Sequence, residues 1–157
     1  MKAITILQPW ASLIACGAKQ IETRSWATKY RGPIAIHAGK NWPKIVTDKT
    51  QRLSESIHLA LCSKGNFSRL ADLPMGAVIA IAELVDCQKV VGNISLKLGT
   101  EKREAAVLEN ANKITGNELA FGDFSYGRYA WILQNVRQID PVPAKGMQRL
   151  WEWEDEE

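Results

Sequence analysis

The sequence predicts an α+β fold, built as a small β-barrel with helices at its periphery. Expected strands outnumber expected helices, and the two kinds of element are scattered along the chain. They do not alternate as they do in a doubly wound parallel sheet. Two of the expected strands, residues 76–89 and 128–139, are long and rich in apolar residues, which is typical of strands that twist through a barrel wall.

The first forty residues predict the order β-α-β-β. Residues 8–16 have a helical composition with Pro9 near the first turn, and Gly17 is expected to end this helix as its C-cap. A turn is expected at residues 30–33, where glycine and proline occur together. The expected strands are residues 2–7, 19–26 and 33–38.

The rest of the chain predicts the remaining helices, loops and strands of the barrel. Apolar spacing between residues 42 and 62 favours one or two amphipathic helices, and residues 101–112, which are rich in Ala and Glu, are expected to be helical. Residues 116–127 are rich in turn formers and are expected to form surface loops. Residues 150–153 complete the prediction as a short closing strand.

The bulk properties indicate a single domain over residues 1–157. A chain of 157 residues with 46% hydrophobic residues can bury a core of its own. It contains no apolar run long enough for a membrane span and no secretory leader, so we expect a cytoplasmic protein without a membrane partner. Its cysteines, Cys16, Cys62 and Cys87, are odd in number and widely spaced, which favours reduced structural thiols.

The net charge of +3 conceals an asymmetric distribution. Five of the 17 acidic residues lie in the last six positions, which leaves 12 acidic against 20 basic residues in the rest of the chain. A basic body attracts polyanions, although the same charges also serve solubility. Charge alone leaves both interpretations open.

The segment from Gly17 to Arg24 is the main candidate site, because it places Lys19, Glu22 and Arg24 within six residues. Strands are depleted in Lys and Glu, so this concentration indicates either a solvated edge or a function. In an extended strand, Glu22 and Arg24 share one face with Trp26. Lys19 and Arg24 are suited to hold a phosphate or polarise a carbonyl, and Glu22 to accept a hydrogen bond from a base or act as general base. The alternative is a structural ion pair.

Other candidate residues surround this motif in the sequence. Aromatic side chains interleaved with cations are typical of a stacking platform beside phosphate contacts, although core packing remains an alternative for Trp10. His37 is a hydrogen-bond donor or titrating group in an apolar strand, or a structural histidine. With two distant histidines and no carboxylate cluster, neither a metal nor a cofactor is expected. The expected binding residues are Trp10, Trp26, Tyr30, Arg31, His37, Lys40, Ser125, Tyr126 and Arg128.

Several motifs together resemble the ASCH domain, a family named for a segment of the activating signal cointegrator. They are Leu-Gln-Pro-Trp-Ala-Ser-Leu-Ile at residues 7–14, Gly-x-Lys-x-x-Glu-x-Arg at 17–24, Tyr-Arg-Gly at 30–32 and Ile-His-Ala at 36–38. The resemblance implies a PUA-like barrel of mixed, mostly antiparallel strands, and a role in RNA or nucleotide binding. It also implies that Arg128, in a Gly-Arg pair that opens a strand, belongs to the site.

One branch of this family resembles amidohydrolases of N4-acetylcytidine, in which a lysine and a threonine act as base and nucleophile. Here Glu22 occupies the position of that threonine, and Thr23 points to the opposite face of the strand. The resemblance therefore favours an RNA- or nucleotide-binding protein, with DNA as a further nucleic-acid partner. The alternatives are an enzyme, either a metal-independent ribonuclease or a nucleoside amidohydrolase, and a protein-interaction adaptor that uses the acidic residues 152–157.

Overall fold

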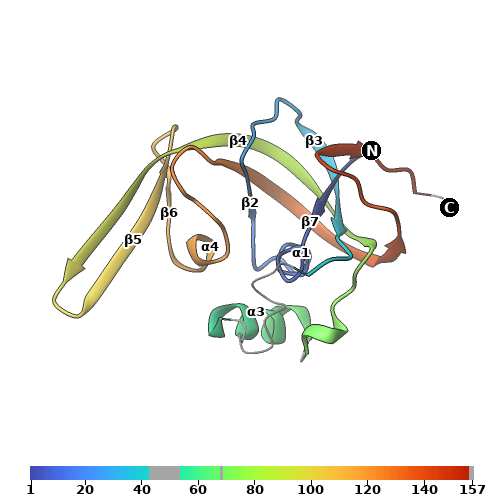
Figure 1. Cartoon of the computed structure of the whole chain (residues 1–157), viewed down its shortest axis with the longest axis horizontal. Helices are drawn as coiled ribbons and strands as arrows, with labels where there is room; N and C mark the ends of the chain where they lie inside the picture. Colours follow the sequence, from blue (N-terminus) through green and yellow to red (C-terminus); the bar gives the residue numbers. More distant parts are fainter. Residues whose placement is uncertain (43–53, 68, 156–157) are drawn as a thin grey trace. The chain divides into compact units, whose positions relative to one another are not determined.

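The computed structural model describes residues 1–42, 54–67 and 69–155 (Figure 1). The chain divides into two compact units, which we call unit 1 and unit 2. Unit 1 comprises Met1–Lys19, Gly32–Glu83 and Asn135–Glu157, and unit 2 comprises Gln20–Arg31 and Leu84–Gln134. A single domain over residues 1–157 stays a prediction.

Unit 1 is organised around strand β1 (Lys2–Ile6), which has a partner on each side. It pairs in parallel with β3 (Gly32–Ala38) and antiparallel with β8 (Leu150–Glu152). The register places Ala3 between Ala35 and Trp151, and these three side chains are buried in one apolar cluster. The order of hydrogen-bonded strands is β4-β3-β1-β8, where β4 (Ala77–Leu98) starts in unit 1.

Two helices belong to unit 1. Helix α1 (Trp10–Ala15) contacts both β3 and helix α3 (Glu55–Gly65). Gly17 has a φ of 81° just after α1, as expected of a glycine at a helix C-terminus. At the start of α3 the Ser54 hydroxyl accepts a hydrogen bond from the Ile57 amide at 3.4 Å. The helical prediction over residues 42–62 is confirmed for α3, and residues 43–53 lie outside the described residues. A short 3-10 turn follows at Leu70–Asp72.

Unit 2 is an antiparallel arrangement in the strand order β2-β7-β4-β5-β6. Strand β7 runs from Tyr129 into unit 1, where it ends at Pro143. Helix α4 (Gly116–Ala120) follows strand β6 (Lys113–Ile114). The core cluster contains Ile21, Val90, Ala106, Leu108, Phe124 and Ala130. The remaining strands are β2 (Ile21–Arg24) and β5 (Glu101–Leu108).

The prediction of a helix over residues 101–112 is wrong, because β5 occupies Glu101–Leu108 and pairs with β4 as a hairpin (Figure 1). Gly99 has a φ of 62°, which lets the chain turn tightly between the two strands. Once the hairpin closes, Ala106 and Leu108 alternate into the core of unit 2. Burial of that face overrides the modest helix propensity of the Ala- and Glu-rich sequence.

The predicted fold class is confirmed: the chain is α+β and mostly antiparallel, with a parallel pair between β1 and β3. The strand order in each unit has two ends, so the word barrel describes the sheet only loosely. The predicted long strands extend further than expected, to Leu98 in β4 and to Pro143 in β7. No helix among the described residues is both long and apolar enough to span a bilayer.

Candidate nucleic-acid interface

Glu22 and Arg24 share one face of β2, as the sequence predicts. The antiparallel register with β7 sets Glu22 opposite Trp131 and Arg24 opposite Tyr129, and residues directly opposite in such a pair lie on the same face. The Nη2 atom of Arg24 lies 3.9 Å from Oε2 of Glu22. That distance is longer than the roughly 2.7–2.9 Å of a charge-assisted hydrogen bond, so this pair interacts as opposite charges without one.

The Glu22 carboxylate is buried at 9% exposure, and its orientation is fixed locally. Its Oε1 atom accepts a hydrogen bond from the Thr23 amide at 2.8 Å. Burial of a carboxylate carries a desolvation penalty that an ion pair at this distance offsets only in part. A buried carboxylate that has a cation nearby is a candidate functional group on physical grounds.

Glu118 of α4 secures the beginning of β2, a role that the sequence analysis missed. Its carboxylate accepts hydrogen bonds from the amides of Gln20, at 3.0 and 3.1 Å, and Ile21, at 2.8 Å. Hydrogen bonds to an ionised acceptor are stronger than those between neutral groups, so this contact holds the strand that carries Glu22 and Arg24. Nothing in the sequence near residue 118 signals this partner, because the two segments are almost one hundred residues apart.

Trp26 and Trp131 support the same face. Trp131 is buried at 1% exposure. Its indole Nε1 donates to the Trp26 carbonyl at 3.3 Å. The two rings pack edge to face, with their centroids 4.7 Å apart and an interplanar angle of 86°. This geometry is a favourable aromatic arrangement. Trp26 is half-buried.

Arg128 is brought to β2 by the loop before β7. Its Nη2 atom donates to the Thr23 carbonyl at 3.2 Å, and its Nε donates to the Asp123 carbonyl at 3.1 Å. The side chain of Asp123 also forms an ion pair with Nε of Arg128 at 3.5 Å. Hydrogen bonds from Ser125 lower the pKa of the Asp123 carboxyl. Arg128 therefore lies beside β2, and its hydrogen bonds also hold the loop before β7 in place.

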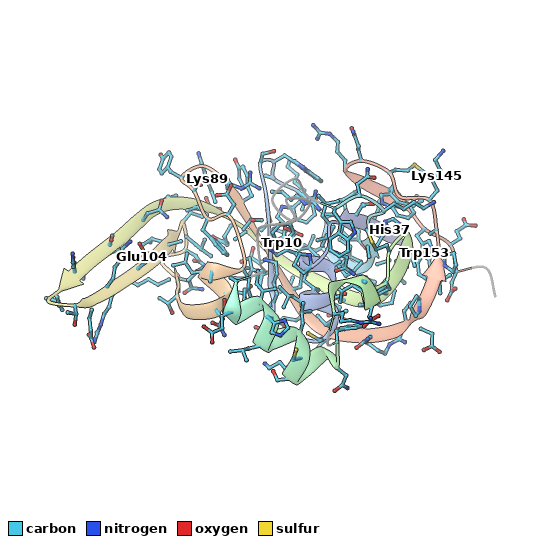
Figure 2. All side chains as sticks on the ribbon, turned by 60° about the horizontal axis from the view of Figure 1, so that its bottom comes forward. Trp10, His37, Lys89, Glu104, Lys145 and Trp153 are labelled. Atoms are coloured by element: carbon cyan, nitrogen blue, oxygen red, sulfur yellow. The ribbon has the colours of Figure 1, made fainter. Side chains whose placement is uncertain are left out.

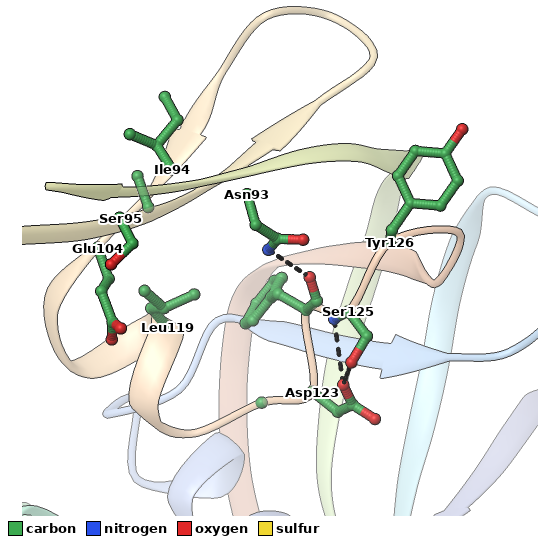
Figure 3. Close-up of a pocket in the computed structure, with 11 residues that line it drawn as sticks. Asn93, Ile94, Ser95, Glu104, Leu119, Asp123, Ser125 and Tyr126 are labelled. Atoms are coloured by element: carbon green, nitrogen blue, oxygen red, sulfur yellow. Dashed lines mark hydrogen bonds between the residues drawn. The ribbon is translucent and has the colours of Figure 1, made fainter.

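Ser125 and Tyr126 line a pocket of about 450 Å³ in unit 2 (Figure 3). The Asn93 side chain crosses to this loop and donates to the Phe124 carbonyl at 3.0 Å. Both the amide and the hydroxyl of Ser125 donate to Asp123. Tyr126 is 71% exposed, and its ring is presented to solvent, as a stacking residue requires.

Tyr30 and Arg31 lie in the irregular segment between β2 and β3, in unit 2. The Arg31 guanidinium donates to the carbonyls of Thr28 and Tyr30 at 3.0 and 2.9 Å, and lies 3.6 Å from the Asp86 carboxylate. These contacts hold the segment between β2 and β3, so Arg31 has a structural role besides its predicted one. Tyr30 is half-buried.

The other predicted residues belong to unit 1. Lys19 is buried at 1% exposure, and its amide donates to the Leu13 carbonyl at 3.0 Å, which fixes the turn after α1. It lies two residues before β2 along the chain. Trp10 begins α1 and is half-buried, whereas Lys40, just beyond β3, is exposed.

His37 is also a residue of unit 1, and it is fully buried in β3. Its Nε2 lies 2.9 Å from the Ala144 carbonyl, and its Nδ1 lies 3.2 Å from the Thr5 hydroxyl. Burial is the main cause that lowers the pKa of His37. These contacts match the structural alternative that the sequence left open.

Within residues 1–42, 54–67 and 69–155, no group of three or more His, Cys, Asp or Glu side chains could hold a metal ion. The three cysteines are not in disulfides. Burial raises the pKa of the Cys87 thiol, which disfavours its reactive thiolate form. The chemistry of the described residues is therefore that of charged, hydrogen-bonding and aromatic side chains.

Comparison with known proteins places the chain in a family. The ASCH domain family model matches residues 4–143, which include parts of both units. The chain is also similar to activating signal cointegrator 1 of Homo sapiens and of Mus musculus, each 32% identical over 84 residues. These matches cover 54% of this chain but 14% of each relative, so the chain spans a small part of their length. The resemblance seen in the sequence is thus confirmed, and the chain belongs to the ASCH domain family.

Proposed function

We propose that this ASCH domain binds RNA or a nucleotide through the charged face of β2. The observation that carries the proposal is the Glu22–Arg24 pair, which is partly excluded from water and lies opposite Trp131, whose ring contacts Trp26. The attraction within such a charged pair repays little more than the cost of removing its charges from water. Ligand binding therefore explains the presence of the pair better than stability does. The family is linked to RNA binding, which favours nucleic acid over other ligands.

Each residue of the motif has a role in this proposal. Arg24 presents a planar guanidinium, which suits two-point contact with a phosphate or a base edge. Glu22 accepts from an exocyclic amine of the base, and Trp26 offers an aromatic face for stacking. Arg128 keeps the loop before β7 against Thr23 and contributes a further cation.

The test is a binding titration with single-stranded RNA over a range of salt concentrations. We expect Arg24→Gln to weaken binding about tenfold and to reduce the salt slope by about one. The matched control is Arg103→Gln, which removes the same charge from the β5 hairpin, where Arg103 pairs with exposed Glu101. Equal losses in the two variants would show that only net charge matters and would overturn the assignment.

DNA of the same sequence is the parallel arm of this titration. The 2′-hydroxyl lets a protein distinguish RNA from DNA, so a preference for RNA should disappear when the ribose is replaced by deoxyribose. If RNA and DNA bind equally, the proposed ligand becomes any single-stranded nucleic acid. If neither binds, the proposal fails.

A second candidate, hydrolysis of a nucleoside or of RNA, is favoured by the burial of Lys19. Lysine is almost never fully buried, and buried lysines serve as bases in several enzymes. The test measures turnover of acetylcytidine and of single-stranded RNA by metal-free protein. We expect Lys19→Ala and Glu22→Gln to abolish turnover while the fold persists. Absence of turnover by the unmodified protein removes this candidate.

A further inference from the structure

Unit 1 contains a pocket of about 770 Å³ at the end of β3, apart from the residues that carry the proposed function in unit 2. It is lined on one side by the end of β3 and the residues after it, including His37 and Lys40. The other side is the segment between β7 and β8, including Lys145 and Gly146. Figure 2 labels His37 and Lys145, which both belong to this unit.

The charge of this pocket has one sign. The charged side chains among its lining residues are Lys40 and Lys145, and no carboxylate of residues 1–42, 54–67 and 69–155 lines it. Both lysines are exposed, and neither forms an ion pair with another residue of the described chain. Two ammonium groups at one concave surface repel each other, and an anion between them removes that repulsion. Asn41 and Gln148, whose side-chain amides can donate hydrogen bonds, also line the pocket.

A chain of hydrogen bonds joins three lining residues of the pocket, Thr5, His37 and Ala144, to the Trp151 side chain. The Trp151 indole can only donate, so the Thr5 hydroxyl accepts from it at 3.2 Å. Nε2 of His37 lies 2.9 Å from the carbonyl oxygen of Ala144. Because a carbonyl oxygen can only accept a hydrogen bond, Nε2 carries the proton. In the neutral ring Nδ1 is then the acceptor for Thr5 at 3.2 Å. His37 thereby ties β3 to the segment that bears Lys145.

Glycines allow the two sides of the pocket to approach. A Cβ atom at Gly146 would lie 2.5 Å from Cε1 of His37, so this position accommodates no side chain without a shift. Gly76, with a φ of 65°, lies under the aliphatic stem of Lys40, and a Cβ there would come within 2.7 Å of Cε. The Ala144 amide donates to the Gly76 carbonyl at 3.1 Å. Backbone packing therefore positions both lysine-bearing segments.

We propose that this pocket is a phosphate-binding site in which Lys40 and Lys145 hold the anion above the floor formed by His37 and Gly146. Lysine is a compact cation that binds phosphate as a point charge, and nearby amide groups add directional hydrogen bonds. The phosphate comes either from a free nucleotide or from an RNA backbone. The inference deepens the proposed function and rests on it for the source of the phosphate, although the pocket can be tested alone.

The first experiment follows amide chemical shifts of the full chain during titration with inorganic phosphate, at an ionic strength held constant with sodium chloride. We expect saturable shifts at His37, Lys40, Lys145 and Gly146. The same shifts with chloride alone, or shifts without saturation, would overturn the proposal, because ionic screening would explain them.

The second experiment compares two charge-matched double variants. Lys40→Gln with Lys145→Gln should weaken phosphate binding by about tenfold or more, since two charge-assisted contacts are lost. Lys97→Gln with Lys113→Gln removes two exposed lysines from unit 2 and should leave the affinity unchanged. Equal effects in the two variants contradict the proposal. Lys40→Arg with Lys145→Arg should retain most of the binding.

The source of the phosphate is found with three probes: a nucleoside 5′-monophosphate, the same nucleoside without phosphate, and a short RNA without terminal phosphates. Binding of the monophosphate but not the other two assigns the site to a free nucleotide. Sensitivity of RNA binding to the double variant assigns it to the RNA backbone. If Arg24→Gln loses RNA affinity while the phosphate shifts persist, the two sites are independent. If no RNA binds but the phosphate shifts persist, the proposed function fails while the pocket stands.

Discussion

The two units use their cations in opposite ways. In unit 2 the arginines are engaged by carboxylates: Arg24 faces Glu22, Arg31 faces Asp86 and Arg128 faces Asp123. In the pocket of unit 1 Lys40 and Lys145 face no carboxylate of the described chain. Paired arginines have fixed geometry and suit discrimination between ligands, whereas unpaired lysines suit attraction of an anion. The difference predicts that stability depends on the arginine–carboxylate pairs of unit 2 and little on the two pocket lysines of unit 1.

Removal of Trp131 should have the largest effect. Trp131→Ala empties a buried site opposite Glu22 and deletes the hydrogen bond to the Trp26 carbonyl. We expect a loss of about 3–5 kcal/mol in the free energy of unfolding, measured by urea denaturation. Tyr126→Ala is the control, because an exposed aromatic should contribute less than about 0.5 kcal/mol. Similar values for the two variants would contradict the framework role of Trp131.

Neutralisation of Glu22 should have the next largest effect. Glu22→Gln leaves Arg24 without its buried partner, and we expect a loss of about 1–3 kcal/mol, less than for a fully buried pair because Arg24 is partly exposed. The double variant with Arg24→Gln should recover part of this loss. Additive effects in the double-mutant cycle would show that the two charges do not interact.

Replacement of Glu118 should weaken the beginning of β2. Glu118→Gln retains one acceptor oxygen but removes the charge that faces the Gln20 and Ile21 amides. We expect a loss of about 1–2 kcal/mol and faster hydrogen exchange at these two amides. Unchanged exchange would mean that the Glu118 contact does not hold the strand.

Acidification should destabilise unit 1 through His37. Because burial lowers the pKa of His37 in the folded chain, the unfolded chain takes up its proton at a higher pH. The contribution of the neutral ring is complete above the unfolded pKa of about 6.5, and it is lost as the pH falls toward the lower folded value. His37→Gln should therefore flatten the dependence of the free energy of unfolding on pH in this window. An identical pH profile in the variant would refute this.

The pocket lysines should have the smallest effect on stability. Lys40→Gln and Lys145→Gln should each change the free energy of unfolding by less than about 0.5 kcal/mol, because exposed side chains without ion pairs contribute little. A larger loss, measured by the same urea denaturation, would show that these lysines are structural and would remove the contrast between the units.

Local signals accounted for much of the fold and for part of the site. Gly17 ended α1 as a left-handed glycine does, and strand alternation put Glu22 and Arg24 on one face. The failures came from partners distant in sequence. Residues 101–108 became a strand because the turn at Gly99 brought them to β4, and no composition rule weighs that partner against helix propensity.

The site was predicted less completely than the fold for the same reason. Glu118 and Asp123 hold β2 and Arg128 through contacts that span long stretches of chain or a loop, and neither carries a motif. The structural role of His37 depends on Ala144, more than one hundred residues away. The sequence shows which residue types lie near the motif, but it could not show which cations have carboxylate partners.

The division of the chain also restricts how this domain can be cut or recombined. Unit 2 consists of Gln20–Arg31 and Leu84–Gln134, so the backbone passes from one unit to the other four times, twice inside the strands β4 and β7. No single truncation releases either unit whole, and a fragment ending within β4 or β7 would leave unpaired strand edges that favour aggregation. Genetic exchange of one unit between relatives would require two simultaneous segment replacements, so the two units are expected to be inherited together.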